Sequence, residues 1–298
     1  MINIVIPMAG AGSRFVNAGY ALPKPLIDVC GKTMVEVVCH NLRPSIAHKF
    51  IFICRDDHLR AHQLDKVLQS VAPSCDIICI DKVTEGAACT VLLARSLIDN
   101  QRPLMIANCD QFIDINIDDY LAAFDTEAVD GMIMTMSASD EKWSFVRLDQ
   151  RRQVVELKEK RVISNEATVG IYNFSKGSDF VSAASSMIAK NIRTNNEFYV
   201  APVYNEMISI GKKIDIFNIG EPGNGMHGLG TPTDLNAFLE TVSAAKHQET
   251  TDENYFTSRI LEVTSREKHN KCLSKVVFSW IWYRNRHSRF KGRTCHIS

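Results

Sequence analysis

The chain has 298 residues, of which 45% are hydrophobic and 23% are charged. This composition is typical of a soluble globular protein with a sizeable core, and it excludes disordered and fibrous proteins. Thirty-four basic and 34 acidic residues cancel. Eight of the basic residues and none of the acidic ones lie between Lys268 and Ser298, so the rest of the chain is net acidic and is not expected to bind nucleic acid.

Short apolar runs alternate with amphipathic ones in the first half of the chain. This alternation predicts an α/β fold, with a mostly parallel central sheet and helices on both faces. Loops that follow the strands of such a sheet meet along one edge, where ligands bind. The predicted strands are residues 2–8, 50–54, 76–80 and 103–107, and the predicted helices are residues 34–41, 58–70 and 87–97.

The second half of the chain changes character and predicts a smaller, mixed sheet on the substrate side. A hairpin turn is expected at residues 149–153 and a loop at residues 222–225. The predicted strands are residues 131–136, 145–148, 154–158, 168–174 and 213–219, and the predicted helices are residues 177–190, 203–210 and 233–245.

The pattern degrades near the end of the chain, so we expect a domain at residues 1–246 and a basic, partly apolar tail at residues 247–298. The apolar and aromatic run Val276–Tyr283 is too short to span a membrane. Three interpretations stay open: a helix that packs on the body, a contact with a membrane surface or a partner, or non-native sequence after a change of reading frame.

The nine cysteines include no Cys-x-x-Cys pair and lie mostly in apolar runs, such as Ile53-Cys54 and Ile77-Ile78-Cys79. We interpret them as buried thiols in a reducing compartment. The opening residues lack the cationic and long apolar regions of a secretory signal, and no run reaches the ~18–20 apolar residues of a membrane span. These features together predict a cytoplasmic protein.

A glycine-rich turn, Gly10-Ala11-Gly12-Ser13-Arg14-Phe15, follows the first predicted strand, and Pro23-Lys24-Pro25-Leu26 comes shortly after it. Glycines let backbone N–H groups approach an anion, while Arg14 and Lys24 add cationic donors suited to phosphate oxygens. The turn lacks the third glycine of the Rossmann fingerprint and the Gly-Lys-Ser/Thr of the Walker loop. Two glycines alone would indicate only a turn, but the two cations favour a phosphate-binding site.

With these two motifs the chain resembles the sugar-phosphate nucleotidyltransferase family, whose nucleotide loop reads Gly-x-Gly-Ser/Thr-Arg-Phe/Leu and then Pro-Lys-Pro-Leu. The resemblance covers residues 1–245 and is closest to a bacterial branch tied to capsule and surface-polysaccharide synthesis, which includes cytidylyltransferases. Further motifs follow in the family's order: Thr84-Glu85-Gly86-Ala87-Ala88, Asn108-Cys109-Asp110, Glu159-Lys160, Thr168-Val169-Gly170-Ile171-Tyr172 and Gly230-Thr231-Pro232.

The resemblance implies a Rossmann-like, glycosyltransferase-A-like fold and a reaction. An NMP group would pass from an NTP to a phosphorylated sugar or another small phosphorylated molecule, with release of pyrophosphate and with Mg²⁺ as cofactor. CTP is slightly favoured by the branch, and UTP and dTTP stay open. The expected partners are these two substrates and further copies of the chain in a homo-oligomer, but no nucleic acid.

Roles for single residues also come from the resemblance. Arg14 would hold the β- and γ-phosphates, Lys24 would bridge the α-phosphate and the incoming phosphate, and Asp110 would coordinate Mg²⁺. Residues expected to bind the nucleotide are Ala9, Gly10, Ala11, Gly12, Ser13, Arg14, Lys24, Glu85, Gly86, Ala87 and Asn108. Residues expected to bind the second substrate are Glu159, Lys160, Gly170, Tyr172 and Glu197.

The chain departs from the family at one point. Relatives often carry a second metal carboxylate just before the late Gly-Thr, and Gly228 occupies that position here. Either another acid, with Asp114 and Glu206 as candidates, completes the metal site, or Asp110 holds the ion with phosphates and water. His227 is either a pocket residue or a structural one.

Two other functions are weighed beside this one. A nucleotide-sugar-dependent glycosyltransferase of the same fold would carry Asp-x-Asp, whereas this chain has Asp110-Gln111-Phe112 and also the cationic loop. A non-catalytic, nucleotide-binding regulatory protein is the second alternative, favoured by the missing acid and the unusual tail.

Overall fold

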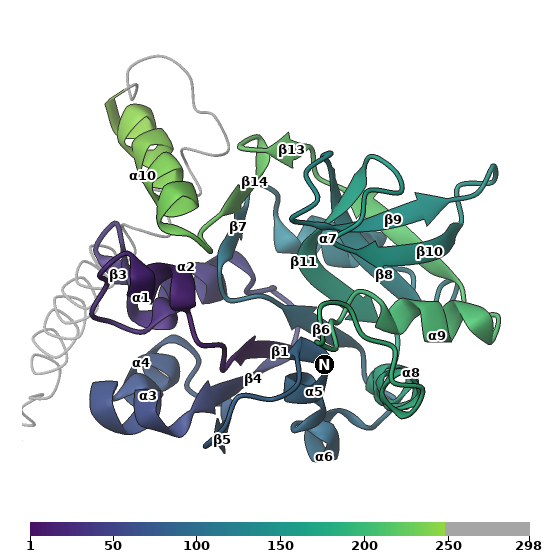
Figure 1. Ribbon diagram of the computed structural model, residues 1–298, viewed down its shortest axis with the longest axis horizontal. Helices are drawn as coiled ribbons and strands as arrows, with labels where there is room; N and C mark the ends of the chain where they lie inside the picture. The colour runs from purple at the N-terminus through teal and green to yellow at the C-terminus, as the bar shows by residue number, and fades with distance from the viewer. Residues whose placement is uncertain (248–298) are drawn as a thin grey trace, which may run out of the picture. The chain divides into compact units, whose positions relative to one another are not determined.

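A computed structural model of the chain describes residues 1–247 (Figure 1). Its main sheet has nine strands, of which four form a parallel block in the order β6-β1-β4-β5. Strand β1 lies in the centre of this block and is buried along almost its whole length, as expected for a strand covered on both faces. The four strands are β1 (Ile2–Met8), β4 (His48–Arg55), β5 (Asp76–Ile80) and β6 (Leu104–Ala107).

The other strands of this sheet extend it beyond β6 in mixed directions. Strand β11 runs antiparallel to β6 and pairs on with β8 and β9, while β10 and β12 lie outside these two. The long strand β11 therefore joins the parallel block to the half of the molecule that carries Glu159 and Lys160. These strands are β8 (Gly131–Ser137), β9 (Ser144–Leu148), β10 (Val154–Glu159), β11 (Glu166–Phe174) and β12 (Ile214–Asn218).

Helices cover both faces of the parallel block, and Figure 1 shows α2 and α5 on opposite sides of β1. Helix α2 contacts α4 on one side, whereas α5 contacts β1 and α8 on the other. The helices are α1 (Ser13–Asn17), α2 (Met34–Asn41), α3 (Asp56–His62), α4 (Leu64–Val71), α5 (Ala87–Leu92), α6 (Arg95–Ile98), α7 (Ile117–Ala123), α8 (Gly177–Ala189), α9 (Val203–Ser209) and α10 (Pro232–His247), with a short 3-10 helix η1 (Lys24–Leu26).

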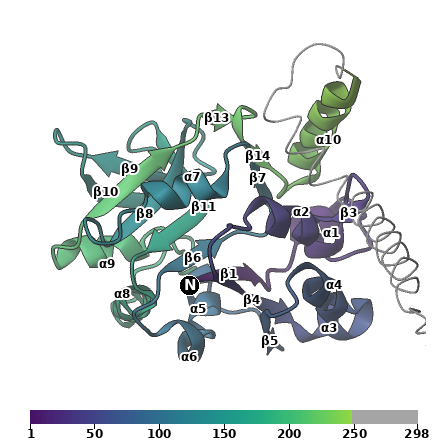
Figure 2. The same cartoon turned by 180° about the vertical axis from the view of Figure 1, so that it is seen from behind.

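A smaller mixed sheet lies between α10 and the part of the main sheet that holds β8 to β11, as the reverse view shows (Figure 2). Its order is β13-β14-β7, and a buried amide holds it to the main body: Asn41 of α2 donates to the carbonyl of Ile113 at 2.8 Å and accepts from its amide at 2.9 Å. These strands are β7 (Gln111–Ile113), β13 (Glu221–Pro222) and β14 (Gly225–Gly228), and a separate two-stranded ribbon joins β2 (Asp28–Val29) to β3 (Lys32–Thr33).

The predicted fold class is confirmed, with local corrections. The helix predicted at residues 58–70 is two helices, because Gln63 between them adopts a left-handed backbone with φ 52°. The helix predicted at residues 87–97 is also two, α5 and α6. The thiol of Cys79 is exposed rather than buried, whereas Cys54 beside it in the sheet is buried.

The prediction of a separate tail at residues 247–298 falls outside the described residues, apart from His247 itself, and stays a prediction. Among residues 1–247, no helix has both the length and the apolar character that crossing a membrane requires.

Candidate active site

The glycine-rich turn connects β1 to α1 at the carboxyl edge of the parallel block. Gly12 adopts φ +61°, a left-handed conformation that favours glycine, and its carbonyl accepts hydrogen bonds from the amides of Phe15 and Val16. Phe15 is buried and anchors the short helix on the core. A Cβ added to Gly12 would lie 3.5 Å from Cβ of Lys24, so the turn passes directly beside that lysine.

Lys24 is positioned by the 3-10 turn that it begins, with Pro23 before it and Pro25 after it. Its ammonium donates a hydrogen bond to Oδ2 of Asp110 at 2.8 Å, and each side chain is only 24% exposed. Burial by itself disfavours the charged ammonium, but the charge of Asp110, the neighbouring Cys109 and the hydrogen bond to Asp110 together outweigh this effect and raise the pKa of Lys24 above its ordinary value. Lys24 is therefore a fixed cation at neutral pH.

Asp110 lies just beyond β6, where the loops of the parallel block converge. The backbone carbonyl of Asp110 accepts a hydrogen bond from the amide of Leu229 at 2.8 Å, which ties this turn to the segment after β14. A Cβ added to Gly230 would come within 2.5 Å of Oδ2 of Asp110. Glycine is needed at position 230 because the carboxylate lies against its backbone.

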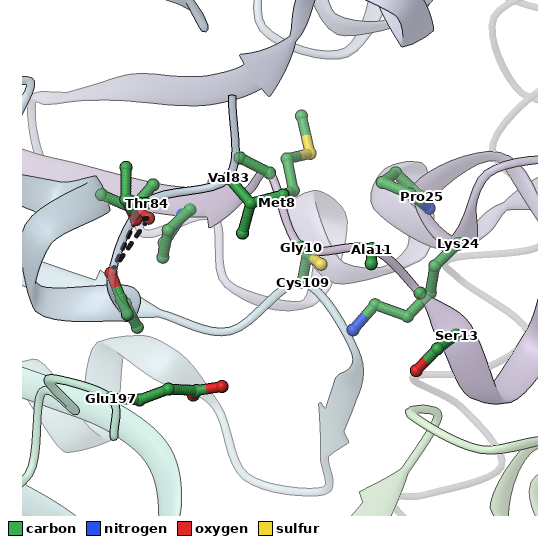
Figure 3. Close-up of a pocket in the computed structure, with 16 residues that line it drawn as sticks. Met8, Gly10, Ala11, Ser13, Lys24, Pro25, Val83, Thr84, Cys109 and Glu197 are labelled. Carbon is green, nitrogen blue, oxygen red and sulfur yellow. Dashed lines mark hydrogen bonds between the residues drawn. The ribbon is translucent and has the colours of Figure 1, made fainter. Parts of the chain in front are cut away.

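Lys24 and the glycine-rich turn border a cavity of about 410 Å³, whereas Asp110 lies behind Lys24 and does not line it (Figure 3). In the close-up, the side chain of Lys24 extends toward the turn from one end, and Glu197 lies on the opposite wall from Met8 and Val83. The lining residues are Pro7, Met8, Ala9, Gly10, Ala11, Gly12, Ser13, Lys24, Pro25, Val83, Thr84, Gly86, Ala87, Thr90, Cys109 and Glu197.

The far end of the cavity is formed by the loop before α5, here called the base loop (Thr84–Ala88). Gly86 has φ +137°, and a Cβ on it would lie 2.4 Å from the carbonyl oxygen of Phe198, so no larger residue fits there without a shift. The hydroxyl of Thr84 donates to the Gly86 carbonyl at 2.9 Å and lies 2.6 Å from the hydroxyl of Thr90.

Four of the residues predicted to bind the second substrate lie on β10, on β11 or directly after β10: Glu159, Lys160, Gly170 and Tyr172. The fifth, Glu197, lies between α8 and α9 and lines the cavity. The carboxylate of Glu159 accepts a hydrogen bond from the Ser144 hydroxyl, and its burial raises its pKa. The ammonium of Lys160 donates to the hydroxyl of Tyr199 at 2.7 Å. Burial, reinforced by the charge of Glu159, also raises the pKa of Tyr172, which keeps its phenol protonated.

Gly170 joins the two halves of the site. Its φ is +83°, and a Cβ there would lie 2.2 Å from the side-chain nitrogen of Asn108. Its carbonyl accepts a hydrogen bond from the Asn108 amide at 3.0 Å. Gly170 thus lets β11 approach the turn that carries Asn108 and Asp110, and it acts through this close packing rather than through a side chain.

The structure brings most of the predicted nucleotide residues together around the cavity, but three of them do not line it: Arg14, Glu85 and Asn108, whose backbone amide donates to the carbonyl of Gly170. Arg14 is exposed on α1 and does not line the cavity. Glu85 points to solvent with 66% of its side chain exposed and pairs with Arg193. Sequence analysis assigned no site role to Cys109 or Thr90, although both line the cavity. Cys109 sits between two predicted site residues, Asn108 and Asp110, and that spacing was the available signal.

The candidates for a second metal ligand are engaged elsewhere. Asp114 binds the ring of His227 at 3.0 Å and the amide of Gly225 at 2.8 Å. The carboxylate of Glu206 accepts hydrogen bonds from the Ser186 hydroxyl and the Lys190 ammonium. His227 is a structural residue here: it packs against Phe112 and Phe238 and does not line the cavity.

Comparison with known proteins agrees with this architecture. Residues 4–201 match the family described as nucleotidyl transferase, and the chain belongs to that family. It is therefore an enzyme of the nucleotidyltransferase class. No curated protein gives a significant match to the chain.

Solved structures with the same fold are numerous. A nucleoside-diphosphate-sugar pyrophosphorylase from Vibrio cholerae RC9 is 28% identical with a TM-score of 0.68, covering 80% of this chain and 99% of that one. A putative glucose-1-phosphate thymidylyltransferase from Bacillus anthracis is 17% identical (TM-score 0.65), covering 86% of this chain and 99% of its own. An inositol-1-phosphate CTP transferase from T. maritima is 16% identical (TM-score 0.64), covering 80% and 94%; at these lower identities the likeness concerns the fold.

Proposed function

We propose that the protein transfers a nucleoside monophosphate from an NTP to a small phosphorylated molecule, a sugar phosphate above all, and releases pyrophosphate. The observation that carries this proposal is the position of Lys24, a buried cation beside the glycine-rich turn, at the end of a cavity large enough for a nucleotide. The opposite side of the site carries Glu159 and Lys160, which suit the hydroxyls and the phosphate of the second substrate.

In this reaction an oxygen of the acceptor phosphate attacks the α-phosphorus of the NTP. A new P–O bond forms, the bond from the α-phosphorus to the bridging oxygen breaks, and pyrophosphate leaves with that electron pair. The attacking group is already an anion, so the protein has to position two anions and offset their repulsion. Lys24 would neutralise charge at the α-phosphate, while Arg14 would turn from solvent to the β- and γ-phosphates.

We expect a divalent metal ion, Mg²⁺, which would be bound by a carboxylate of the protein together with the phosphates of the substrates. No cluster of three or more His, Cys, Asp or Glu side chains that could hold a metal occurs among residues 1–247. Mg²⁺ is commonly bound by one or two carboxylates together with substrate phosphates, and Asp110, which is paired with the cavity-lining Lys24, offers one carboxylate. Asp110 would hold the ion, which would supply further charge neutralisation at the phosphates.

The base loop supports cytosine as the preferred base. The carbonyls of Glu85 and Gly86 already accept hydrogen bonds, from the amide of Phe198 and from Thr84 and Thr90 respectively. The amides of Gly86, which precedes α5, and of Ala87, which begins it, have no carbonyl partner within residues 1–247. The loop thus offers neighbouring donors. Cytosine presents two adjacent acceptors, N3 and O2, whereas uracil and thymine place an N–H between theirs.

The resemblance of the motifs to a capsule and surface-polysaccharide branch supports an activated sugar or alditol precursor as the product, made in the cytoplasm. The decisive experiment is a pyrophosphate-release screen of CTP, UTP, dTTP, GTP and ATP against phosphorylated sugars, alditols and amides. We expect release with CTP and at least one acceptor, and its loss in the Asp110→Ala variant.

The same screen separates the two alternatives. A glycosyltransferase would use a nucleotide sugar and release a nucleoside diphosphate but no pyrophosphate. A regulatory protein would bind an NTP tightly without turnover, and its binding would be insensitive to Asp110→Ala. Either result would overturn the proposed function.

A further inference from the structure

A short hairpin crosses from the nucleotide side of the site to the acceptor side. Thr194 and Glu197 exchange backbone hydrogen bonds at 3.0 and 2.9 Å, and the two residues between them, Asn195 and Asn196, both have positive φ (49° and 64°). Two successive left-handed residues define a type I′ turn, in which asparagine is one of the favoured residues. The turn sends Phe198 and Tyr199 back toward the site. We call residues 193–199 the bridge segment.

At the nucleotide side, the bridge segment is hydrogen-bonded to the base loop. The amide of Phe198 donates to the carbonyl of Glu85 at 2.8 Å, and the carbonyl of Phe198 accepts from the amide of Ala88 at 2.9 Å. These two bonds flank Gly86, whose lack of a Cβ permits the approach. If the base loop moves when a nucleotide binds, Phe198 has to move with it, because these two hydrogen bonds connect them.

The side chain of Arg193 stabilises this contact between the bridge segment and the base loop. Its guanidinium binds the carboxylate of Glu85 and the backbone carbonyl of Asn196, and it lies 4.0 Å above the ring of Phe198. One side chain thus holds the turn, the buried aromatic ring and the base loop together. Arginine suits this role because its planar, forked group can stack and donate several hydrogen bonds at once.

At the acceptor side, the next residue of the segment holds Lys160. The hydroxyl of Tyr199 accepts a hydrogen bond from the Lys160 ammonium at 2.7 Å, and that ammonium lies 4.9 Å from the centre of the Tyr199 ring. Lys160 itself has a left-handed backbone, with φ 53°, and its amide donates to the carbonyl of Trp143 at 3.0 Å. The backbone and the side chain of Lys160 are thus both held in place.

We propose that the bridge segment couples the two substrates: a nucleotide bound at the base loop stabilises the segment, and Tyr199 then holds Lys160 in position for the acceptor. Arg193 and Tyr199 are positioning residues in this account, because they act through the base loop and through Lys160. The proposal rests on the proposed function, since it takes the base loop as the nucleotide site. Coupling of this kind is reciprocal, so the acceptor also strengthens nucleotide binding.

Hydrogen exchange followed by mass spectrometry tests the coupling without turnover. The full chain is measured with and without the non-reactive analogue α,β-methylene-CTP, or with the matching UTP or dTTP analogue if the screen selects that base. In the wild type we expect slower exchange in peptides covering residues 84–88, 193–199 and 157–162. In Tyr199→Phe, which keeps the ring but loses the hydroxyl, protection at residues 157–162 should disappear while protection at the other two stays.

Kinetics give the second readout. Tyr199→Phe should raise the KM for the acceptor roughly tenfold, the order expected for losing a hydrogen bond to a charged group, and leave the Kd of the nucleotide, measured without acceptor, within about twofold. Arg193→Lys should raise both KM values, because lysine cannot stack and fork in the same way. Arg95→Lys is the matched control: the exposed Arg95 of α6 pairs with Asp99 and does not line the cavity, and both KM values should match the wild type.

The outcomes are distinct. Protection at residues 84–88 and 193–199 with no change at 157–162 in the wild type, or a rise in the nucleotide Kd measured without acceptor that equals the rise in the acceptor KM in Tyr199→Phe, would overturn the coupling and leave the proposed function standing. No protection at any of the three peptides, together with no binding of any nucleotide, would overturn the proposed function and the coupling with it.

Discussion

The ammonium of Lys24 lies 2.8 Å from a carboxylate oxygen of Asp110, although 86 residues separate the two in the chain. They meet because both follow strands of the same parallel block, β1 and β6, whose carboxyl ends lie side by side. Lys24 lines the cavity, and the pair places one acid directly beside this cation. Phosphate binding by Lys24 and metal binding by Asp110 both start from this contact.

Replacing Lys24 by alanine should lower kcat/KM at least ~100-fold, on the scale of losing one preorganised charge stabiliser. The measurement is steady-state pyrophosphate release with the substrate pair found in the screen. Lys66→Ala is the matched control, because Lys66 is exposed on α4, donates a hydrogen bond to Gln63 and does not line the cavity. A Lys24→Ala variant with near wild-type kcat/KM would show that the cation has no part in the reaction.

Removal of metal should abolish activity, and Asp110 should set the metal requirement. We expect chelation to stop pyrophosphate release, added Mg²⁺ to restore it, and Asp110→Asn to raise the Mg²⁺ concentration for half-maximal rate by at least ~10-fold. Asp114→Asn should leave that concentration unchanged, since Asp114 is held by His227 and Gly225. If instead Asp114→Asn shifts the metal requirement and Asp110→Asn does not, the assignment of the ligand is wrong.

Gly86→Ala should destabilise the protein by about 2–3 kcal/mol, because the new methyl group overlaps the backbone of Phe198 in a conformation that already disfavours alanine. Gly19→Ala separates the two causes: Gly19 also has positive φ (+83°), but no atom lies within 4 Å of its added Cβ. We expect about 1 kcal/mol for this control from backbone strain alone. Urea unfolding measures both values, and equal losses would mean that the approach to Phe198 is unimportant.

Ionisation of Glu159 should lower the stability of the ligand-free protein as the pH rises from acidic values. Burial raises the pKa of its carboxyl from the ordinary value of 4.5. A raised pKa means that the folded state binds the proton more tightly, so this stabilisation is complete below 4.5 and is lost as the pH rises through the folded-state value.

The test compares urea midpoints of wild type and Glu159→Gln between about pH 4 and pH 7. The glutamine carbonyl can still accept the hydrogen bond from Ser144, but it does not ionise. The wild type should therefore lose more stability over this range than the variant does. Parallel pH profiles for the two proteins would show that Glu159 does not contribute to this dependence.

The sequence by itself determined the order of the elements and the position of the phosphate-binding turn. Strands β1 and β5 and helix α2 have the residue bounds that their patterns predicted, because period and turn chemistry are local properties. The glycine-rich turn and Lys24, which lies between two prolines, were equally predictable from the sequence. A left-handed glycine and two prolines restrict the backbone wherever they occur.

Only the tertiary structure decided which of the candidate residues meet. Arg14 was predicted beside the phosphates, yet its side chain lies outside the cavity lining. The sequence left Asp114 and Glu206 as candidate ligands of a metal ion. In the structure His227 binds Asp114 and Lys190 binds Glu206. Glu85 and Arg193 are 108 residues apart. Such contacts depend on how strands and loops pack in three dimensions, and no local pattern of residues encodes that packing.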